Sequence, residues 1–244
     1  MRSLKFIFAF LVIFFIFFSA KPLFAKKNKS RLNAKDYVVQ KLKINPVTHL
    51  SISGPFIVHL KQGNCSNLMI ETNESDLNFV KIQQSGEKLK IKLDKTINWV
   101  RINQKIDIFI TTQDLSMIDL KGAAIIVGQS CFKTDHLKIS ARGPGELTLG
   151  IEVEKLNVAI RGSGLVKLTG FAKHQDIEVA GSGKYKATEL ESETADINVK
   201  GSGYSYLNVE KELNVKVYGS GNVIYKGSPS IQSQAYGSGK VKAM

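Results

Sequence analysis

The sequence predicts an all-β fold, a right-handed parallel β-helix-like solenoid, and three observations lead to it. Twelve of the 20 glycines form Gly-x-Gly doublets at a nearly constant spacing. Apolar residues alternate with polar residues, with a period of two, on both sides of these doublets. The 244 residues are 43% apolar and 23% charged, an ordinary globular composition that excludes a wholly disordered chain and a polytopic membrane protein.

The doublets define a repeat. They begin at Gly143, Gly162, Gly181, Gly201, Gly219 and Gly237, so the separations are 19, 19, 20, 18 and 18 residues. A weaker copy, without the second glycine, starts at Gly122. About 20 residues at roughly 3.3 Å each suffice for one solenoid turn but not for a four-stranded propeller blade. We therefore expect about 18–21 residues per coil over residues 121–244.

The alternation within each repeat predicts two short strands joined at a corner. The positions two residues before each doublet are all apolar: Ala141, Ile160, Val179, Val199, Val217 and Ala235. After the doublets the alternation resumes, although Tyr185 and Ser205 interrupt it. Glycine permits a positive φ or a close approach of two backbones, so the doublet is the predicted corner. Pro144 lacks an N–H donor, and we expect it to interrupt the ladder of stacked coils at its corner.

The N-terminal half repeats less clearly. Alternation is kept at residues 50–52, 56–60, 88–93 and 105–110, and turns are indicated at Gly63 and Gly86. These patterns predict irregular strands over residues 36–120 and no long helix. We take residues 36–244 as a single β-solenoid domain, in which residues 121–244 form the Gly-x-Gly coils.

Residues 1–25 have the features of a secretory signal peptide. Arg2 and Lys5 precede an uninterrupted apolar run at residues 6–18, and Ala25 ends the segment. A membrane span needs about 20 apolar residues, so we expect cleavage after Ala25 rather than an uncleaved anchor. The protein is therefore expected to be exported to the periplasm, the cell surface or the outside.

A basic linker follows at residues 26–35. Removing residues 1–25, with three basic residues and no acid, lowers the formal charge from +13 to +10. The linker holds five more basic residues, which leaves about +5 for the remainder. Such an arm could contact an anionic membrane surface, although a solvated linker is the simpler interpretation. Export argues against nucleic acid as a partner.

Cysteine and histidine usage predicts neither a metal site nor a cofactor. Cys65 and Cys131 either form the one disulfide that an oxidising compartment allows or remain as two buried thiols. Four scattered histidines without a Cys-x-x-Cys pair do not match a structural zinc site.

One strip of outward positions is the candidate binding site. It comprises Lys167, Lys184, Lys186, Tyr204 and Tyr206. Tyrosine offers a flat apolar face and a hydroxyl group, and lysine offers a positive charge, so the strip could bind a glycan by stacking or an anionic polymer by charge. The structural alternative is that these lysines keep exposed strands soluble and block edge-to-edge association.

The recurring corners also resemble those of a known family. They read Arg161–Gly164, Ala180–Gly183, Lys200–Gly203, Tyr218–Gly221 with Val223–Gly227, and Tyr236–Gly239. Over roughly residues 45–243 the chain resembles the putative auto-transporter adhesin head GIN domain family. The resemblance implies an exported bacterial protein with a parallel β-helix-like fold, and it implies no particular biochemical role.

Three functions stay open. The first is a non-enzymatic, adhesin-like β-solenoid that binds an envelope or surface glycan or an anionic polymer. The second is a polysaccharide-degrading β-helix enzyme, but no carboxylate pair on one wall is visible, and Glu189, Glu191 and Glu193 gather in one predicted turn. The third is a structural envelope protein or a homo-oligomer assembled through the open ends of the stack.

Overall fold

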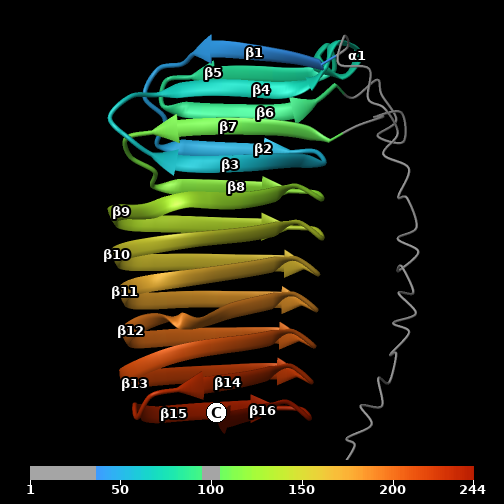
Figure 1. The fold of residues 1–244 in the computed structure, drawn as a ribbon. Coiled ribbons are helices and arrows are strands. Elements are labelled where there is room, and N and C mark those ends of the chain that lie inside the picture. The colour runs from blue at the N-terminus through green and yellow to red at the C-terminus, as the bar shows by residue number, and fades with distance from the viewer. Residues whose placement is uncertain (1–36, 95–104) are drawn as a thin grey trace, which may run out of the picture. The chain divides into compact units, whose positions relative to one another are not determined.

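The computed structural model describes residues 37–94 and 105–244, all within one compact unit that spans residues 34–244. Strands contain 77% of these residues and form a β-solenoid of about seven turns (Figure 1). The predicted all-β solenoid is therefore confirmed. Among the described residues no helix is long and apolar enough to cross a membrane. The predicted signal peptide and basic linker lie outside the described residues.

The N-terminal elements are β1 Tyr37–Lys43, β2 His49–Ser53, β3 Phe56–Gln62, β4 Asn67–Asn73, α1 Glu74–Leu77, β5 Val80–Ser85, β6 Lys88–Leu93, β7 Ile106–Thr112 and β8 Met117–Lys121. The C-terminal strands are β9 Ile125–Arg142, β10 Glu146–Gly162, β11 Leu165–Gly181, β12 Lys184–Gly201, β13 Tyr204–Gly219, β14 Asn222–Lys226, β15 Ser230–Tyr236 and β16 Lys240–Ala243.

The C-terminal half is a sequential parallel stack. β10 pairs in parallel with β9 and β11, and the next long strands continue the same pattern. Each long strand passes through two stacked sheets. Face A is the outer surface of the sheet that follows the corners, with strand order β1-β4-β7-β3-β9-β10-β11-β12-β13-β14-β16. Face B is the outer surface of the other sheet, formed by β5, β6, β2, β8, the second parts of β9–β13, and β15.

Stacked aliphatic ladders form the core between the two sheets. The ladder that precedes the corners is in register from coil to coil and consists of Leu120, Ala141, Ile160, Val179, Val199 and Val217, all buried. Each fully buried aliphatic side chain contributes about 1.5–3 kcal/mol before conformational entropy is counted. The predicted internal ladders are therefore present. They end at Ala235, which is exposed in the last strand of face B.

The apparent interruptions at Tyr185 and Ser205 are part of the core. Both residues are fully buried and lie opposite each other in neighbouring coils. The Tyr185 hydroxyl donates a hydrogen bond to Gln175 Oε1 at 2.5 Å. Gln175 is itself buried opposite Ala195 of the next coil. The two large polar side chains of one coil thus pack against two small residues of the next, which preserves the packing of the stack.

The glycine corners bring successive backbones very close together. Gly201 has a φ of +114°, and a Cβ atom built on it would lie 2.6 Å from the carbonyl oxygen of Gly181. The next residue, Ser202, donates its backbone N–H to that same oxygen at 2.9 Å. A side chain at this position would therefore meet the backbone of the preceding coil and break the contact.

Pro144 does not interrupt the ladder, contrary to expectation. β9 and β10 pair on both sides of its corner, through Arg142 with Arg161 and through Ile125 with Glu146. At the equivalent position of later corners, a serine such as Ser182 donates its backbone N–H to the preceding coil, and this one hydrogen bond is what Pro144 cannot make. The neighbouring Glu146 N–H still donates to Ala124 O at 2.9 Å, so the flanking bonds hold the corner in place.

The N-terminal half stacks its coils out of sequence order. β2 and β3 form one coil around Gly54, which has a φ of +147°. β6 and β8 pair in parallel with the two edges of β2, and β7 and β9 do the same for β3. Antiparallel pairs of β1 with β4, β4 with β7, and β5 with β6 complete this end (Figure 1).

The two cysteines adopt neither predicted arrangement. Cys65 and Cys131 are free and exposed, so they are neither bonded to each other nor buried. Cys65 lies in the turn between β3 and β4, and Cys131 lies at the bend of β9 between the two sheets. Both positions lie outside the aliphatic ladders, at bends of the chain. Partial desolvation, and then the nearby Glu152 carboxylate, raise the pKa of the Cys131 thiol.

Candidate functional site

The five side chains of the predicted strip lie together on face A. Lys167, Lys186 and Tyr206 are in register on β11, β12 and β13 and form one column. Lys184 and Tyr204 are in register in the neighbouring column. In-register residues of adjacent strands lie about 4.8 Å apart, so charges and aromatic rings follow each other along the stack. The register of the repeat, which the glycine spacing predicts, is what brings these five side chains together.

A hollow of about 390 Å³ lies over the first column, lined by Lys167, Lys186, Tyr206 and Glu189 among others. The Lys167 ammonium group is 3.5 Å from a Glu189 carboxylate oxygen. Lys184 and Lys186 have no ion-pair partner among the described residues. Tyr204 is 40% exposed, so its ring is available to a flat ligand. The strip can therefore offer positive charge and aromatic surface at the same place.

The three glutamates that were expected in a turn lie along β12 instead. Glu189, Glu191 and Glu193 occupy the bend where this continuous strand passes between the two sheets. The ammonium group of Lys211 lies 2.8 Å from a Glu193 oxygen, and this hydrogen bond lowers the pKa of the Glu193 carboxyl. A carboxyl whose pKa is lowered is a poor general acid, because it is ionised at neutral pH.

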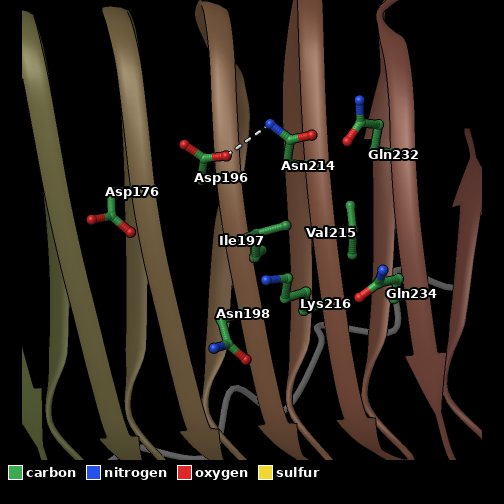
Figure 2. Close-up of a pocket in the computed structure, with 9 residues that line it drawn as sticks. All are labelled: Asp176, Asp196, Ile197, Asn198, Asn214, Val215, Lys216, Gln232 and Gln234. Atoms are coloured by element: carbon green, nitrogen blue, oxygen red, sulfur yellow. Dashed lines mark hydrogen bonds between the residues drawn. The ribbon is translucent and has the colours of Figure 1, made fainter.

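Face B contains a polar ladder that the sequence analysis missed. Its members occupy the position five residues before each of the last five doublets: Asn157, Asp176, Asp196, Asn214 and Gln232. Figure 2 shows four of them in a row across neighbouring strands. Asn157 Nδ2 donates to Asp176 Oδ2 at 3.1 Å, and Asn214 Nδ2 donates to Asp196 Oδ1 at 2.9 Å. Extending the glycine-based alignment by one position would have identified this ladder in the sequence.

The two aspartates of this ladder line a hollow of about 490 Å³, together with Asn198 and Lys216 (Figure 2). His174 lies beside them, with Nε2 3.5 Å from Asp196 Oδ2 and Nδ1 2.8 Å from Thr194 Oγ1. Each aspartate is thus held by an amide donor, and one also faces an imidazole. The described residues contain no group of three or more His, Cys, Asp or Glu side chains that could hold a metal ion.

The fold, with its glycine corners and stacked parallel coils, defines a β-solenoid protein. Residues 46–229 match the sequence profile of the family described as "Putative auto-transporter adhesin, head GIN domain". This match covers well over half of the chain, and the chain therefore belongs to that family. None of the curated proteins matches the chain in sequence.

Several solved structures have the same fold. A putative adhesin from Bacteroides fragilis is 24% identical with a TM-score of 0.82, and the match covers 86% of this chain and 98% of that one. A putative lipid binding protein from Parabacteroides distasonis is 20% identical with a TM-score of 0.68, with the same two coverages. A putative adhesin from Parabacteroides distasonis is 18% identical with a TM-score of 0.68, covering 86% and 97%.

Proposed function

We propose that the protein is an exported, non-enzymatic, adhesin-like binding protein that attaches to a glycan or another anionic polymer of the cell envelope or surface. The supporting observation is the strip of Lys167, Lys184, Lys186, Tyr204 and Tyr206 on face A, in two adjacent columns. Tyrosine rings stack on the apolar faces of sugars, and lysines attract carboxylate, sulfate or phosphate groups. A ligand with both features fits this strip.

Family membership supports an exported or surface location. The apolar run at residues 6–18 and Ala25 add the sequence features of a signal peptide to this inference. The similar solved structures are described as adhesins or as a lipid binding protein, and their identities below 25% carry only the fold to this chain. The ligand class is therefore argued from the side chains of face A.

The test is a four-fold alanine variant with Lys184, Lys186, Tyr204 and Tyr206 replaced. A glycan array and pull-down with isolated envelope polysaccharides would first identify a bound polymer, and titration would then give its affinity. We expect the variant to lose about tenfold or more in affinity, because charge and stacking contributions both disappear. Circular dichroism would check that the variant is folded.

A matched control removes the same residue types from face B: Lys200, Lys216, Tyr218 and Tyr236. This control changes the net charge and the number of aromatic rings equally, and it leaves face A intact. We expect it to bind as tightly as the unmodified protein. Equal binding by all three proteins would exclude this part of face A as the attachment surface.

A polysaccharide-degrading enzyme is a second candidate, favoured by Asp176 and Asp196 in the hollow of face B. Their in-register placement on neighbouring strands brings two carboxylates to one wall, as such chemistry requires. Each carboxylate accepts a hydrogen bond from an asparagine amide, which suits an ionised group better than a general acid. Turnover of a uronate polymer that the Asp176→Asn and Asp196→Asn variants abolish would establish this alternative.

A further inference from the structure

A second hollow on face A lies near the N-terminal end of the stack, far from the strip in sequence. Its volume is about 540 Å³, and its floor includes Met69 of β4 and Phe109 of β7. Lys41 and Lys43 of β1 form one rim, and Lys61 of β3 lies on the other side. From β1 to β3 there are three strand spacings, so the hollow is about 14 Å wide across the sheet.

The three lysines of this hollow have no acidic partner among the described residues. Elsewhere on the protein many lysines and arginines form ion pairs, such as Lys121 with Asp119 at 2.8 Å and Arg161 with Glu178 at 3.0 Å on face B. A positive charge without a partner beside an apolar floor favours an anionic ligand.

The floor of the hollow is a fixed flat surface. The ring of His59 stacks on Phe109 with centroids 4.4 Å apart and an interplanar angle of 11°. Asp107 holds the imidazole through a 2.9 Å contact between its Oδ1 atom and His59 Nε2. Asn67 and Thr111 lie next to this stack and offer groups that can bind hydroxyls. A flat aromatic surface beside hydroxyl-binding groups suits a sugar ring better than an acyl chain, which requires an enclosed apolar channel.

The register of the sheet joins this hollow to the predicted strip. One column of outward residues runs through Phe109, His59, Val127, Thr148, Lys167, Lys186, Tyr206, Ile224 and Lys242. The two residues between the hollow and the strip, Val127 and Thr148, are neutral and of modest size. The sheet of face A has eleven strands along this direction, which correspond to about 48 Å at 4.8 Å per spacing.

We propose that face A is one continuous track for a linear anionic glycan, in which the N-terminal hollow of Lys41, Lys43 and Lys61 is a second subsite. This inference rests on the proposed function and adds that the ligand is a linear chain spanning both subsites, with a second group of contact residues. A chain that reaches both subsites binds by avidity, so that the affinity rises with length until the chain spans the track.

The test measures the binding of uronic acid oligomers of increasing length to the full chain by titration calorimetry. The subsite variant carries Lys41→Ala, Lys43→Ala and Lys61→Ala. The matched control carries Lys88→Ala, Lys90→Ala and Lys92→Ala, which removes three lysines from β6 in the sheet of face B at the same end. We expect the subsite variant to lose about tenfold in affinity for long oligomers and little for short ones, while the control binds normally.

Comparison of the two variants separates this inference from the proposed function. If the subsite variant binds long oligomers normally and the four-fold variant of the strip does not, the continuous track is wrong and the proposed function stands. If neither variant changes the binding of any oligomer, both are wrong. Binding to vesicles with anionic lipid that depends on the three lysines, without any effect on oligomers, would overturn the glycan assignment in favour of a membrane surface.

Discussion

The two halves of the solenoid reach the same stacked architecture in different ways. From β9 onward, each coil is added to the preceding one in sequence order, with parallel pairing and glycine on glycine at every corner. From β1 to β8, the chain places the coil of β2 and β3 between two later coils and adds antiparallel strands at the end. The C-terminal half is therefore built from local neighbours, and the N-terminal half from distant ones.

This difference shows what the repeat contributes. Where the sequence repeats, identical positions stack on each other, so one alignment specifies the core, the corners and the outer columns. Where it does not repeat, alternation still indicates which side chains are buried, but the order of the strands depends on packing between distant segments. We expect the two halves to differ energetically as well as topologically.

The largest effect is expected at the corner glycines of the C-terminal half. Gly201→Ala places a Cβ atom 2.6 Å from the backbone oxygen of Gly181, at a φ of +114°. Gly86, in the turn between β5 and β6, has a φ of +56°, and a Cβ atom added by Gly86→Ala would have no atom within 4 Å. We expect a loss of about 3 kcal/mol or more in the free energy of unfolding for Gly201→Ala and about 1 kcal/mol for Gly86→Ala.

Urea denaturation followed by circular dichroism would compare these two glycine variants with the unmodified protein. Equal losses would mean that the close stacking of corners contributes nothing beyond the ordinary preference of glycine for a positive φ.

A smaller effect is expected from the polar pair inside the C-terminal core. Tyr185→Phe removes the hydroxyl that donates a hydrogen bond to Gln175 Oε1. The Nε2 atom of this buried amide already lacks a partner among the described residues, so the amide of the variant loses its bond at the oxygen as well. The expected loss in unfolding free energy is about 1–3 kcal/mol. In the N-terminal half, Thr112→Val removes a 2.6 Å hydrogen bond to Val47 O and is expected to cost a similar amount.

A double variant sharpens the interpretation. Gln175→Leu combined with Tyr185→Phe removes both polar partners, and we expect it to recover much of the stability that Tyr185→Phe loses, because no buried polar group is then left unsatisfied. Thermal and urea unfolding of the two single variants and the double variant would measure the coupling. Simple additivity of the two single losses would contradict the direct bond as the cause.

The smallest effect is a pH dependence of the N-terminal half through His49. Burial, and then the positive charge of Lys88, lower the pKa of this imidazole below its ordinary value of 6.5, while Asp119 opposes the shift and Lys121 adds to it. The folded state therefore binds the proton less readily than the unfolded state. Its contribution to stability is fully present above pH 6.5 and is lost as the pH falls through the lowered pKa.

Unfolding of the unmodified protein and His49→Gln between pH 7.5 and about 5 would measure this contribution. We expect the unmodified protein to lose more stability on acidification. Its slope of unfolding free energy against pH should differ from that of His49→Gln by the equivalent of at most one bound proton. Identical slopes for the two proteins would remove His49 as a source of the pH dependence.

The sequence predicts the repeated part of the molecule well and the exceptions less well. The ladder at Val179 and Val199 follows from the alignment on glycine, as does the outward strip at Lys186 and Tyr206. Tyr185 interrupts the aliphatic pattern when its coil is considered alone. The space for its ring comes from the small Ser205 in the next coil, and this pairing is visible only when the two coils are compared. The polar ladder that includes Asp196 could have been predicted, since it lies at a fixed distance in sequence from the glycines.

Sequence alone determined the fold class, the length of the coil, the corners and the alternation of buried and exposed positions, because a period of two and a period of about 20 residues are both local properties. Only the tertiary structure decided the strand order of the N-terminal half and the assembly of the hollow between β1 and β3. It also showed which lysines of face A have no acidic partner among the described residues. These features depend on which distant segments pack side by side, and the register of that packing is set by the core as a whole.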